Sequence, residues 1–307
     1  MAIGIGLGLA RFPFQQVDNF WRWVELCEDG GVDSIWQTDR LISDEPFLEC
    51  ITALAAIAGA TQQLKFGMNV ASAALRDPLV LAKQCATIDF LSQGRLLPAF
   101  GIGSARAPEW QATGRGTKGR GKRTDEALDI ISQLWRGEPV TLSGDYYHYK
   151  DAVISPLPTQ TKLPVWIGGS SEAAIKRTAR IGTGWQAGLE SPREAGLAKK
   201  AIVEALKERG RHIDDDHYST GFFFYFGKAS DDIAQRELAR FSKLAPGKDL
   251  SHTHAIGTEQ IHQRISEYVN AGMSKFILRP MGNDDADLLE QTRLLIEQIL
   301  PAFKTSA

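Results

Sequence analysis

The chain has 307 residues and a formal net charge of −2. A charge this close to zero provides no overall field to attract nucleic acid or an anionic membrane surface, so we expect neither as a partner. Hydrophobic residues make up 43% of the sequence, and the length suits either two ordinary domains or one α/β barrel.

Short apolar strands alternate with longer amphipathic helices along the whole chain. The expected strands are Ile3–Leu9, Ser34–Gln37, Lys65–Val70, Arg95–Gly101, Val165–Ile167, Gly184–Ala187, Gly221–Phe226 and Lys275–Arg279. The expected helices are Val17–Asp29, Pro46–Ala60, Pro78–Phe90, Arg123–Arg136, Ser171–Ile181, Pro192–Arg209, Asp231–Leu244, Glu259–Ala271 and Asp284–Ile299. This order predicts a single (β/α)8 TIM-barrel domain over residues 1–307, with a doubly wound parallel sheet as the alternative.

Two stretches interrupt the alternation. Pro139–Tyr149 has turn residues between two strand-like runs, which predicts a β-hairpin inserted before the fifth strand. Ala245–Thr258 is polar and contains His252 and His254, and we expect an irregular loop there, before the last helix-strand unit. Long loops of this kind often serve as lids.

The stretch Arg76–Ser104 predicts a complete helix and strand followed by a glycine-rich turn. Asp77 can cap the helix and Pro78 suits its first position. Pro98 lies inside the following strand, where its missing amide hydrogen predicts a bulge. Ligands bind beyond the carboxyl ends of such strands, so the turn at Gly101–Ser104 indicates a binding site.

Two further segments have the residue types of an anion site. Gly168, Gly169, Ser170 and Ser171 join a strand to a helix, where free amides and hydroxyls can hold a phosphate, although the serines can also simply cap the helix. Thr113–Arg123 contains five basic residues and four glycines without an acid. It is either a solvated surface loop or an anion clamp for a cofactor phosphate or an acidic tail.

Other chemistry has little support in the sequence. The histidines lack metal-ligand spacing, so we expect no metal site. Cys27, Cys50 and Cys85 are expected to be buried, reduced thiols. No secretory signal and no membrane-length apolar run is visible, and we expect a cytoplasmic protein.

Asp39, at the end of the second strand with Arg40 beside it, is the best-placed candidate for a catalytic carboxylate. An ion pair that ties down a barrel loop is the alternative interpretation. Five aromatic residues indicate an apolar substrate unless they simply fill the barrel: Trp36, Trp110, Trp185, Phe222 and Phe224.

Several stretches, in this order, resemble the luciferase-like family of flavin-dependent and deazaflavin-dependent oxidoreductases. They are Val32–Trp36, Arg76–Ser104, Arg120–Leu128, Pro164–Trp185 and Gly257–Arg279, and they cover nearly the whole chain. The resemblance implies an eight-stranded barrel with the cofactor ring at the carboxyl ends of the strands. It also implies cofactor contacts at Val70, Ala71 and Ser72, near an expected non-prolyl cis peptide, and phosphate contacts at Ser104, Arg106, Gly168, Gly169, Ser170 and Ser171.

One position departs from the family. Many members have a catalytic histidine directly after the acid that ends the second strand, whereas this chain has Arg40. Arginine stays protonated and cannot act as a base, but it can anchor an anionic substrate or stabilise negative charge. Asp39 and Arg40 are therefore the catalytic candidates, and base catalysis falls to His252, His254 or the cofactor itself.

The first functional hypothesis is a monooxygenase that uses reduced FMN and O2 on a small organic substrate. A separate flavin reductase would supply the reduced flavin, and we expect a homodimer. The main alternative is hydride transfer with the 8-hydroxy-5-deazaflavin coenzyme, whose anionic tail would suit Thr113–Arg123. A non-catalytic flavin-binding barrel is a third possibility, and a pterin-type or sugar-phosphate barrel enzyme is a remote fourth.

Overall fold

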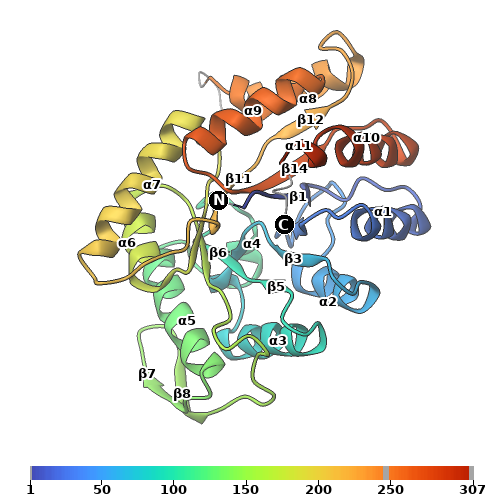
Figure 1. The fold of residues 1–307 in the computed structure, drawn as a ribbon. Coiled ribbons are helices and arrows are strands. Elements are labelled where there is room, and N and C mark those ends of the chain that lie inside the picture. The colour runs from blue at the N-terminus through green and yellow to red at the C-terminus, as the bar shows by residue number, and fades with distance from the viewer. Residues whose placement is uncertain (1, 245–248, 304–307) are drawn as a thin grey trace.

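Short parallel strands form the centre of the molecule, and helices surround them (Figure 1). This computed structural model describes residues 2–244 and 249–303. Its strands are β1 (Gly4–Leu9), β2 (Ser34–Gln37), β3 (Lys65–Met68), β4 (Ala71–Ser72), β5 (Leu96–Leu97), β6 (Ala99–Gly101), β7 (Val140–Ser143), β8 (His148–Ala152), β9 (Trp166–Gly168), β10 (Gly184–Gln186), β11 (Tyr218–Thr220), β12 (Phe223–Tyr225), β13 (His254–Ile256) and β14 (Lys275–Pro280).

Parallel pairing closes these strands into a ring. β1 pairs with β14 and β2, β2 pairs with β3, and β9, β10, β11 and β14 follow one another on the other side. β3 pairs with β5, and β6, the continuation of β5, pairs with β9. The predicted TIM barrel is therefore confirmed, and the doubly wound alternative is wrong.

The helices pack around this barrel (Figure 1). Because the barrel strands are parallel, their carboxyl ends lie at one mouth. The helices are α1 (Val17–Asp29), α2 (Cys50–Ala60), α3 (Pro78–Leu91), α4 (Glu109–Ala112), α5 (Arg120–Trp135), α6 (Glu172–Ile181), α7 (Pro192–Lys207), α8 (Asp232–Leu244), α9 (Thr258–Asn270), α10 (Asp285–Gln298) and α11 (Leu300–Phe303), with the short 3-10 turns η1 (Ala73–Leu75) and η2 (Ser251–Thr253).

Helix ends follow local capping chemistry. The Asp77 carboxylate accepts a hydrogen bond of 3.1 Å from the Val80 amide, as expected for the start of α3. α2 begins at Cys50 rather than Pro46, because the Glu49 carboxylate caps it through the Thr52 amide at 2.7 Å. The sequence reading placed this start four residues too early.

Pro98 divides the fourth barrel strand into β5 and β6, as its missing amide hydrogen predicts. Its carbonyl still accepts a hydrogen bond of 3.0 Å from the Trp166 amide, which keeps β9 in register. The seventh strand was expected at Gly221–Phe226, but the barrel strand is β11, and Gly221 separates it from β12. A side chain at Gly221 would lie 2.2 Å from the Ile277 carbonyl oxygen, so only glycine fits there.

The two predicted interruptions differ in outcome. The hairpin is confirmed as β7 and β8, and the Glu126 carboxylate of α5 holds its tip through the Tyr147 amide at 2.7 Å. The expected irregular loop is correct for residues 249–253, which form a loop with the 3-10 turn η2, and wrong for β13, which pairs with β12 in parallel. Residues 245–248 of that stretch lie outside the described residues.

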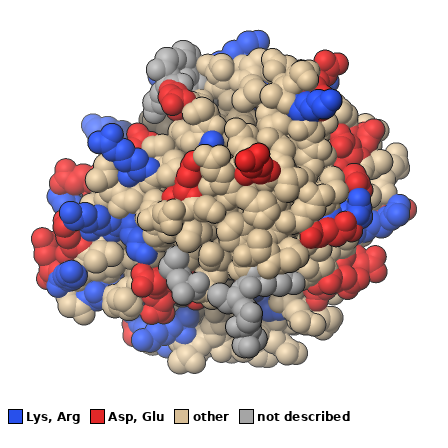
Figure 2. Space-filling model, turned by 45° about the horizontal axis from the view of Figure 1, so that its top comes forward, with Lys and Arg blue, Asp and Glu red and all other residues tan. Residues whose placement is uncertain are grey.

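The surface is mixed in charge. On the face shown in Figure 2, Lys and Arg side chains alternate with Asp and Glu, and uncharged residues lie between them. None of the helices among the described residues is long and apolar enough to cross a membrane. The three cysteines are buried and unpaired, as expected.

Candidate functional site

A mainly apolar cavity of about 480 Å³ opens at the carboxyl ends of the barrel strands. Every barrel strand contributes a residue to its wall: β14 contributes its penultimate residue, Arg279, and the others contribute their last residue or one from the loop that follows. The wall comprises Ala10, Thr38, Asn69, Val70, Gly101, Ile102, Gly103, Gly168, Gly169, Gln186, Ala187, Gly188, Leu189, Gly221, Phe222, Phe223, Phe241, Thr253 and Arg279. This volume and position suit a small cofactor with its substrate.

One side of the cavity is formed by Val70 and glycines. The peptide bond between Asn69 and Val70 is cis, at the place where the family resemblance implied one. Side chains at Gly101 or Gly168 would lie 2.8 Å and 3.1 Å from Val70, so these glycines leave room for its isopropyl group. Of the residues expected here, Val70 reaches the wall, whereas Ala71 is fully buried behind it.

Two cavity residues carry amide groups without partners. The Nδ2 atom of Asn69 and both polar atoms of Gln186 are buried, and none has a hydrogen-bond partner among the described residues. Buried polar groups are normally hydrogen-bonded, and leaving one bare costs about 1–3 kcal/mol. A ligand with both donors and acceptors along one edge would satisfy these amides.

Arg279, at the end of β14, is the charged residue of the cavity wall. Its side chain makes no hydrogen bond or ion pair with any described residue, and its guanidinium lies 5.3 Å from the centre of the Phe223 ring. Burial lowers the pKa of Arg279 to about 10, so it remains charged near neutral pH. An unpaired cation in this position favours an anionic or strongly polar ligand.

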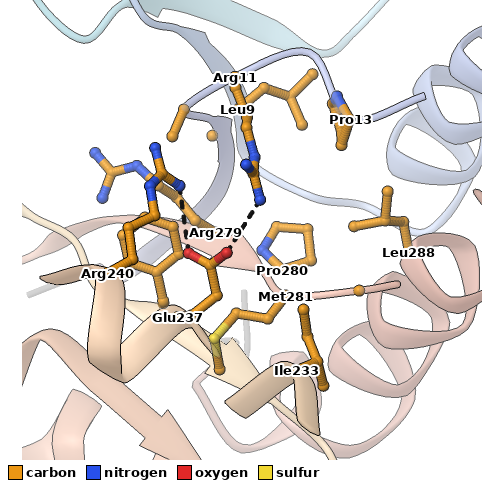
Figure 3. Close-up of a pocket in the computed structure, with 14 residues that line it drawn as sticks. Leu9, Arg11, Pro13, Ile233, Glu237, Arg240, Arg279, Pro280, Met281 and Leu288 are labelled. Carbon is orange, nitrogen blue, oxygen red and sulfur yellow. Dashed lines mark hydrogen bonds and ion pairs between the residues drawn. The ribbon is translucent and has the colours of Figure 1, made fainter. Parts of the chain in front are cut away.

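A small second cavity of about 50 Å³ adjoins the first and shares Arg279 with it (Figure 3). Beside it, the Glu237 carboxylate of α8 pairs with Arg11 at 3.0 Å and with Arg240 at 3.4 Å. Glu45, from the loop after β2, also pairs with both arginines. These ion pairs fix α8 over the barrel mouth.

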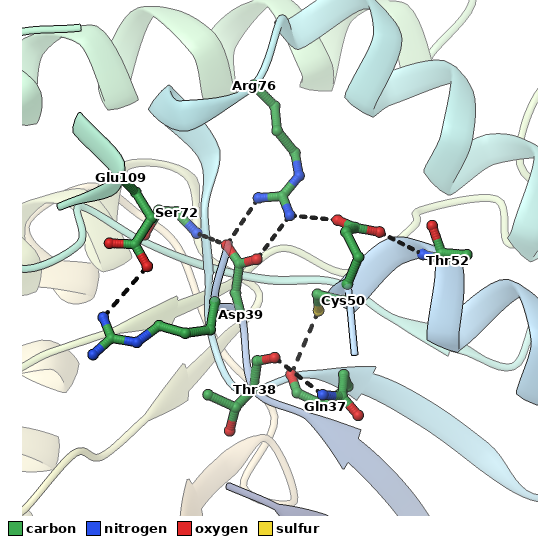
Figure 4. Close-up of polar contacts among 10 residues, drawn as sticks. Gln37, Thr38, Asp39, Cys50, Thr52, Ser72, Arg76 and Glu109 are labelled. Atoms are coloured by element: carbon green, nitrogen blue, oxygen red, sulfur yellow. Dashed lines mark hydrogen bonds and ion pairs between the residues drawn. The ribbon is translucent and has the colours of Figure 1, made fainter. Parts of the chain in front are cut away.

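Asp39 is held in a buried ion-pair network (Figure 4). Its carboxylate accepts hydrogen bonds from Arg76 at 2.7 and 2.8 Å and from the Ser72 amide at 3.0 Å. Arg76 also pairs with Glu49 at 2.6 Å. Burial disfavours the charged form of Arg76, but the hydrogen bonds to these two carboxylates outweigh it and raise its pKa. This geometry matches the alternative interpretation, in which Asp39 ties down a barrel loop.

Arg40 lies at the rim and pairs with Glu109 of α4 at 3.4 Å. The Glu109 side chain is only 3% exposed, and its Oε2 atom has no partner among the described residues. The sequence reading did not select Glu109, because it lies in a four-residue helix that carries no periodic pattern. Arg40 lies two residues after the cavity residue Thr38, so this pair stands close to the cavity wall in sequence.

The four residues of the expected phosphate site, Gly168 to Ser171, do different things in the structure. Gly168 and Gly169 line the cavity, and Ser171 caps α6 through the Ala174 amide at 3.3 Å. The Ser170 hydroxyl donates to the carboxylate of Glu190, which also accepts the Gly188 amide. A carboxylate therefore accepts from the Ser170 hydroxyl, one of the donors that the sequence assigned to a phosphate.

Ser104 and Arg106 lie in an exposed loop directly after the cavity residue Gly103, and neither belongs to the wall. The Ser104 carbonyl accepts a hydrogen bond of 2.8 Å from the Trp110 indole. Of the five aromatic residues expected at a substrate pocket, Phe222 lines the cavity, and all five are buried. Most of them therefore fill the barrel.

The two histidines proposed as bases are not part of the cavity wall, although Thr253 between them is. The His252 imidazole Nε2 contacts the Leu189 carbonyl at 2.9 Å, and His254 stacks on Phe223 with ring centres 5.3 Å apart. Burial, followed by the charges of Arg264 and His252, lowers the pKa of His254 to about 4. His254 is therefore neutral in the folded protein near pH 7.

This shift predicts an acid-sensitive stability. Between pH 6.5 and 4 the unfolded chain binds a proton at His254 that the folded chain excludes, so the free energy of unfolding falls as the pH drops. We expect His254 to make the free energy of unfolding about 2 kcal/mol lower at pH 5 than at pH 7.5. In urea unfolding, His254→Gln should lack this part of the fall in unfolding free energy between pH 7.5 and pH 5. The variant His148→Gln, at an exposed histidine, should retain it. An identical decline in both variants would contradict the assignment.

One group of possible metal ligands occurs among the described residues, comprising Asp214, Asp216 and His217. Both carboxylates are exposed, and the group precedes β11, at the end of the barrel opposite the cavity. It contributes nothing to the candidate site.

Comparison with known proteins identifies the family. A sequence profile described as luciferase-like monooxygenase matches residues 5–286. The chain belongs to the luciferase-like monooxygenase family. Among the relatives of this luciferase-like chain, an F420-dependent glucose-6-phosphate dehydrogenase of Microbacterium testaceum is 27% identical, over 91% of this chain and 91% of its own length. A 5,10-methylenetetrahydromethanopterin reductase of Methanopyrus kandleri is 23% identical, over 87% and 80% respectively.

Solved structures share the luciferase-like barrel. An F420-dependent secondary alcohol dehydrogenase has a TM-score of 0.85 at 19% identity and covers 99% of this chain and 100% of its own. A monooxygenase of Streptomyces bottropensis also has a TM-score of 0.85, at 17% identity, and covers 98% and 100%. At these identities the likeness shows the fold alone, whereas the profile match confirms the family resemblance inferred from the sequence. The chain is thus a luciferase-like oxidoreductase by family.

Proposed function

We propose that the protein transfers a hydride between the 8-hydroxy-5-deazaflavin coenzyme F420 and a small organic substrate. Relatives that cover most of the chain support this choice, because three of them are F420-dependent glucose-6-phosphate dehydrogenases, 25–27% identical to it. We therefore prefer hydride transfer to monooxygenation with reduced FMN. Hydride transfer requires no separate flavin reductase. The homodimer stays a prediction.

The cavity residues fit a deazaflavin ring. The pyrimidine edge of such a ring has both donors and acceptors, which match the bare amides of Asn69 and Gln186. Gly168 and Gly169 would let the cofactor chain leave the cavity over backbone rather than side chains. When bound, the coenzyme supplies or accepts the hydride.

The observation that carries the choice of cofactor is Glu190 beside the phosphate segment. FMN ends in a phosphomonoester with a charge between −1.5 and −2 at neutral pH, whereas F420 carries a singly charged phosphodiester at the same position of its side chain. Because the Glu190 carboxylate already accepts from Ser170 and Gly188, it would repel the FMN phosphate more strongly.

The charged residues then act on the substrate. Arg279 would bind an anionic or strongly polar group of the substrate, since it lines the cavity without an ion pair to any described residue and lies over the Phe223 ring. Arg40 and Glu109 would form a polar pair at the entrance, where Arg40 can stabilise negative charge but cannot accept a proton.

Parallel fluorescence titrations of the full chain with oxidised F420 and with FMN test the proposal. We expect F420 to bind at least tenfold more tightly, and Glu190→Gln to improve FMN binding by roughly tenfold while it improves F420 binding less. Glu172→Gln, an equal charge change in the first turn of α6, is the control, because Glu172 pairs only with Lys176. Tight binding of FMN alone would refute the proposal, and binding without turnover of any substrate would favour a non-catalytic barrel.

A further inference from the structure

Helix α8 contributes one residue to the cavity wall and turns a mixed face toward the barrel. Ile233, Glu237 and Phe241 are four residues apart, so they lie on one face of the helix. Ile233 and Glu237 are 4% and 6% exposed, and Phe241 belongs to the wall. Helices that pack permanently on a core have apolar residues at such positions, as α9 has with Ile261 and Ile265. The centre of the α8 face is instead a carboxylate.

Four charged side chains join α8 to the barrel in a closed ring. The Glu237 carboxylate pairs with Arg11 at 3.0 Å and with Arg240 at 3.4 Å (Figure 3). Glu45 closes the ring, because it pairs with Arg11 at 2.9 Å and with Arg240 at 3.2 Å. Arg11 and Glu45 belong to the loops that follow β1 and β2, and a backbone hydrogen bond of 2.8 Å joins these loops. Two members of this α8 charge ring therefore belong to the barrel and two to the helix.

The α8 charge ring can divide without leaving a charge unpaired. When α8 moves away from the barrel, Arg11 keeps Glu45, and Glu237 keeps Arg240, which lies one turn further along the same helix. Removing one partner of a buried ion pair is costly because the other charge stays buried and uncompensated. Here each side retains a neutral pair, so the charges are satisfied in both the docked and the undocked position of α8.

Apart from the ring, the described part of α8 has few apolar anchors. Its two fully buried apolar residues, Ile233 and Ala234, both lie in the first turn. Further along, Phe241 contacts the rings of Phe223 and His254, with centres 5.0 and 4.8 Å away. The cavity of about 50 Å³ lies between α8 and the ends of β1 and β14, so packing under the helix is incomplete. Elements with few buried apolar contacts are the ones that open locally.

We propose that α8 is a lid on the cavity and that the α8 charge ring is its latch. Undocking of the helix removes Phe241 from the wall and opens the cavity beside Arg279, so that substrate can enter and product can leave. Water and salt reach the ring at its two arginines, which are 39% and 33% exposed, so salt weakens the latch. Glu237 is thus a positioning residue that acts on the cavity through α8. The latch does not depend on which cofactor the cavity binds.

Hydrogen exchange of the full chain, followed by mass spectrometry, tests the latch without cofactor or substrate. We expect the amides of α8 to exchange at least about fivefold faster in about 0.5 M NaCl than in about 0.02 M NaCl, and those of α9 to be unchanged. Glu237→Gln should exchange fast in α8 at both salt concentrations, because the ring has lost the charge at its centre. Lys243→Gln, at an exposed residue of the same helix outside the ring, should behave as the wild type.

Labelling of a thiol in the cavity wall tests whether the movement of α8 controls access. Ala10 lines both cavities, and the three native cysteines are buried, so Ala10→Cys provides a single reactive thiol. We expect uncharged N-ethylmaleimide to label it at least about threefold faster in the high salt than in the low salt. Ala10→Cys/Glu237→Gln should be labelled at the fast rate in both.

Three results would overturn the lid. They are exchange in α8 that does not respond to salt, exchange that accelerates equally in α8 and α9, and a thiol whose labelling stays slow while α8 opens. The salt dependence leaves the ring intact, so it decides the matter even where Glu237→Gln folds poorly. Failure of F420 to bind would overturn the function proposed above and leave the lid unaffected.

Discussion

Replacing Gly169 by Asp is expected to weaken cofactor binding by about 100-fold or more. Gly169 lines the cavity with its backbone at a φ of 102°, and a side chain there would have only the Cβ atom of Ala174 within 4 Å, at 3.6 Å. The new carboxylate would stand at the rim over which the anionic cofactor chain leaves, beside Glu190. Fluorescence titration with oxidised F420 measures the effect.

Gly169→Ala is the matched control, because alanine at this φ incurs the same backbone strain without the charge. We expect it to bind the cofactor within about tenfold of the wild type. Equal affinities for the Asp and Ala variants would show that the rim at Gly169 does not contact the cofactor. Thermal unfolding of both variants verifies that they fold alike.

Replacing Asp39 by Asn is expected to destabilise the protein by about 3 kcal/mol, since it breaks a buried ion pair and leaves Arg76 with one carboxylate. The Asp39 carboxylate also accepts the Ser72 amide, so the segment Asn69–Ser72 loses an anchor beside the cavity. Cofactor affinity should therefore fall as well, by roughly tenfold. Urea unfolding and titration measure the two effects.

A double-mutant cycle identifies the cause. Arg76→Met alone should lower the free energy of unfolding as much as Asp39→Asn does. The double variant should lower it by less than the sum of the two single losses. Glu138→Gln breaks the exposed pair with Arg136 and should cause no measurable change. Additive costs for Asp39 and Arg76, or unchanged cofactor affinity in both variants, would contradict a positioning role for Asp39.

The barrel was predictable because the sequence pattern of each long helix and of most strands is local. Amphipathic helices such as α1 show an apolar face, and the bounds of α1 match the prediction; β2 is bounded by turn residues. The short parallel strand β13 was missed, since three residues carry no period, and its pairing with β12 depends on residues about 30 positions away. The shift of the seventh strand to β11 likewise follows from packing against β14.

The candidate site was predictable only in part. Gly168 and Gly169 mark the cavity wall in the sequence, because Gly168 leaves room for Val70 and Gly169 adopts a φ of 102°. Asp39 looked catalytic beside Arg40, yet its partner Arg76 lies 37 residues later and is invisible to local reasoning. Arg279 belongs to a stretch that carries the family resemblance, but only the folded chain shows that its guanidinium is unpaired.

Hydride transfer with a deazaflavin, rather than oxygenation with FMN, is the reaction that we propose for this luciferase-like barrel. The most direct measurement follows the 420 nm absorbance of the coenzyme on the full chain under nitrogen, with a panel of small alcohols, aldehydes and ketones that carry anionic groups. We expect a substrate-dependent change in this band without oxygen, and a smaller change in Arg279→Met. Product formation that requires reduced FMN and oxygen, with no change in the deazaflavin band for any substrate, would contradict it.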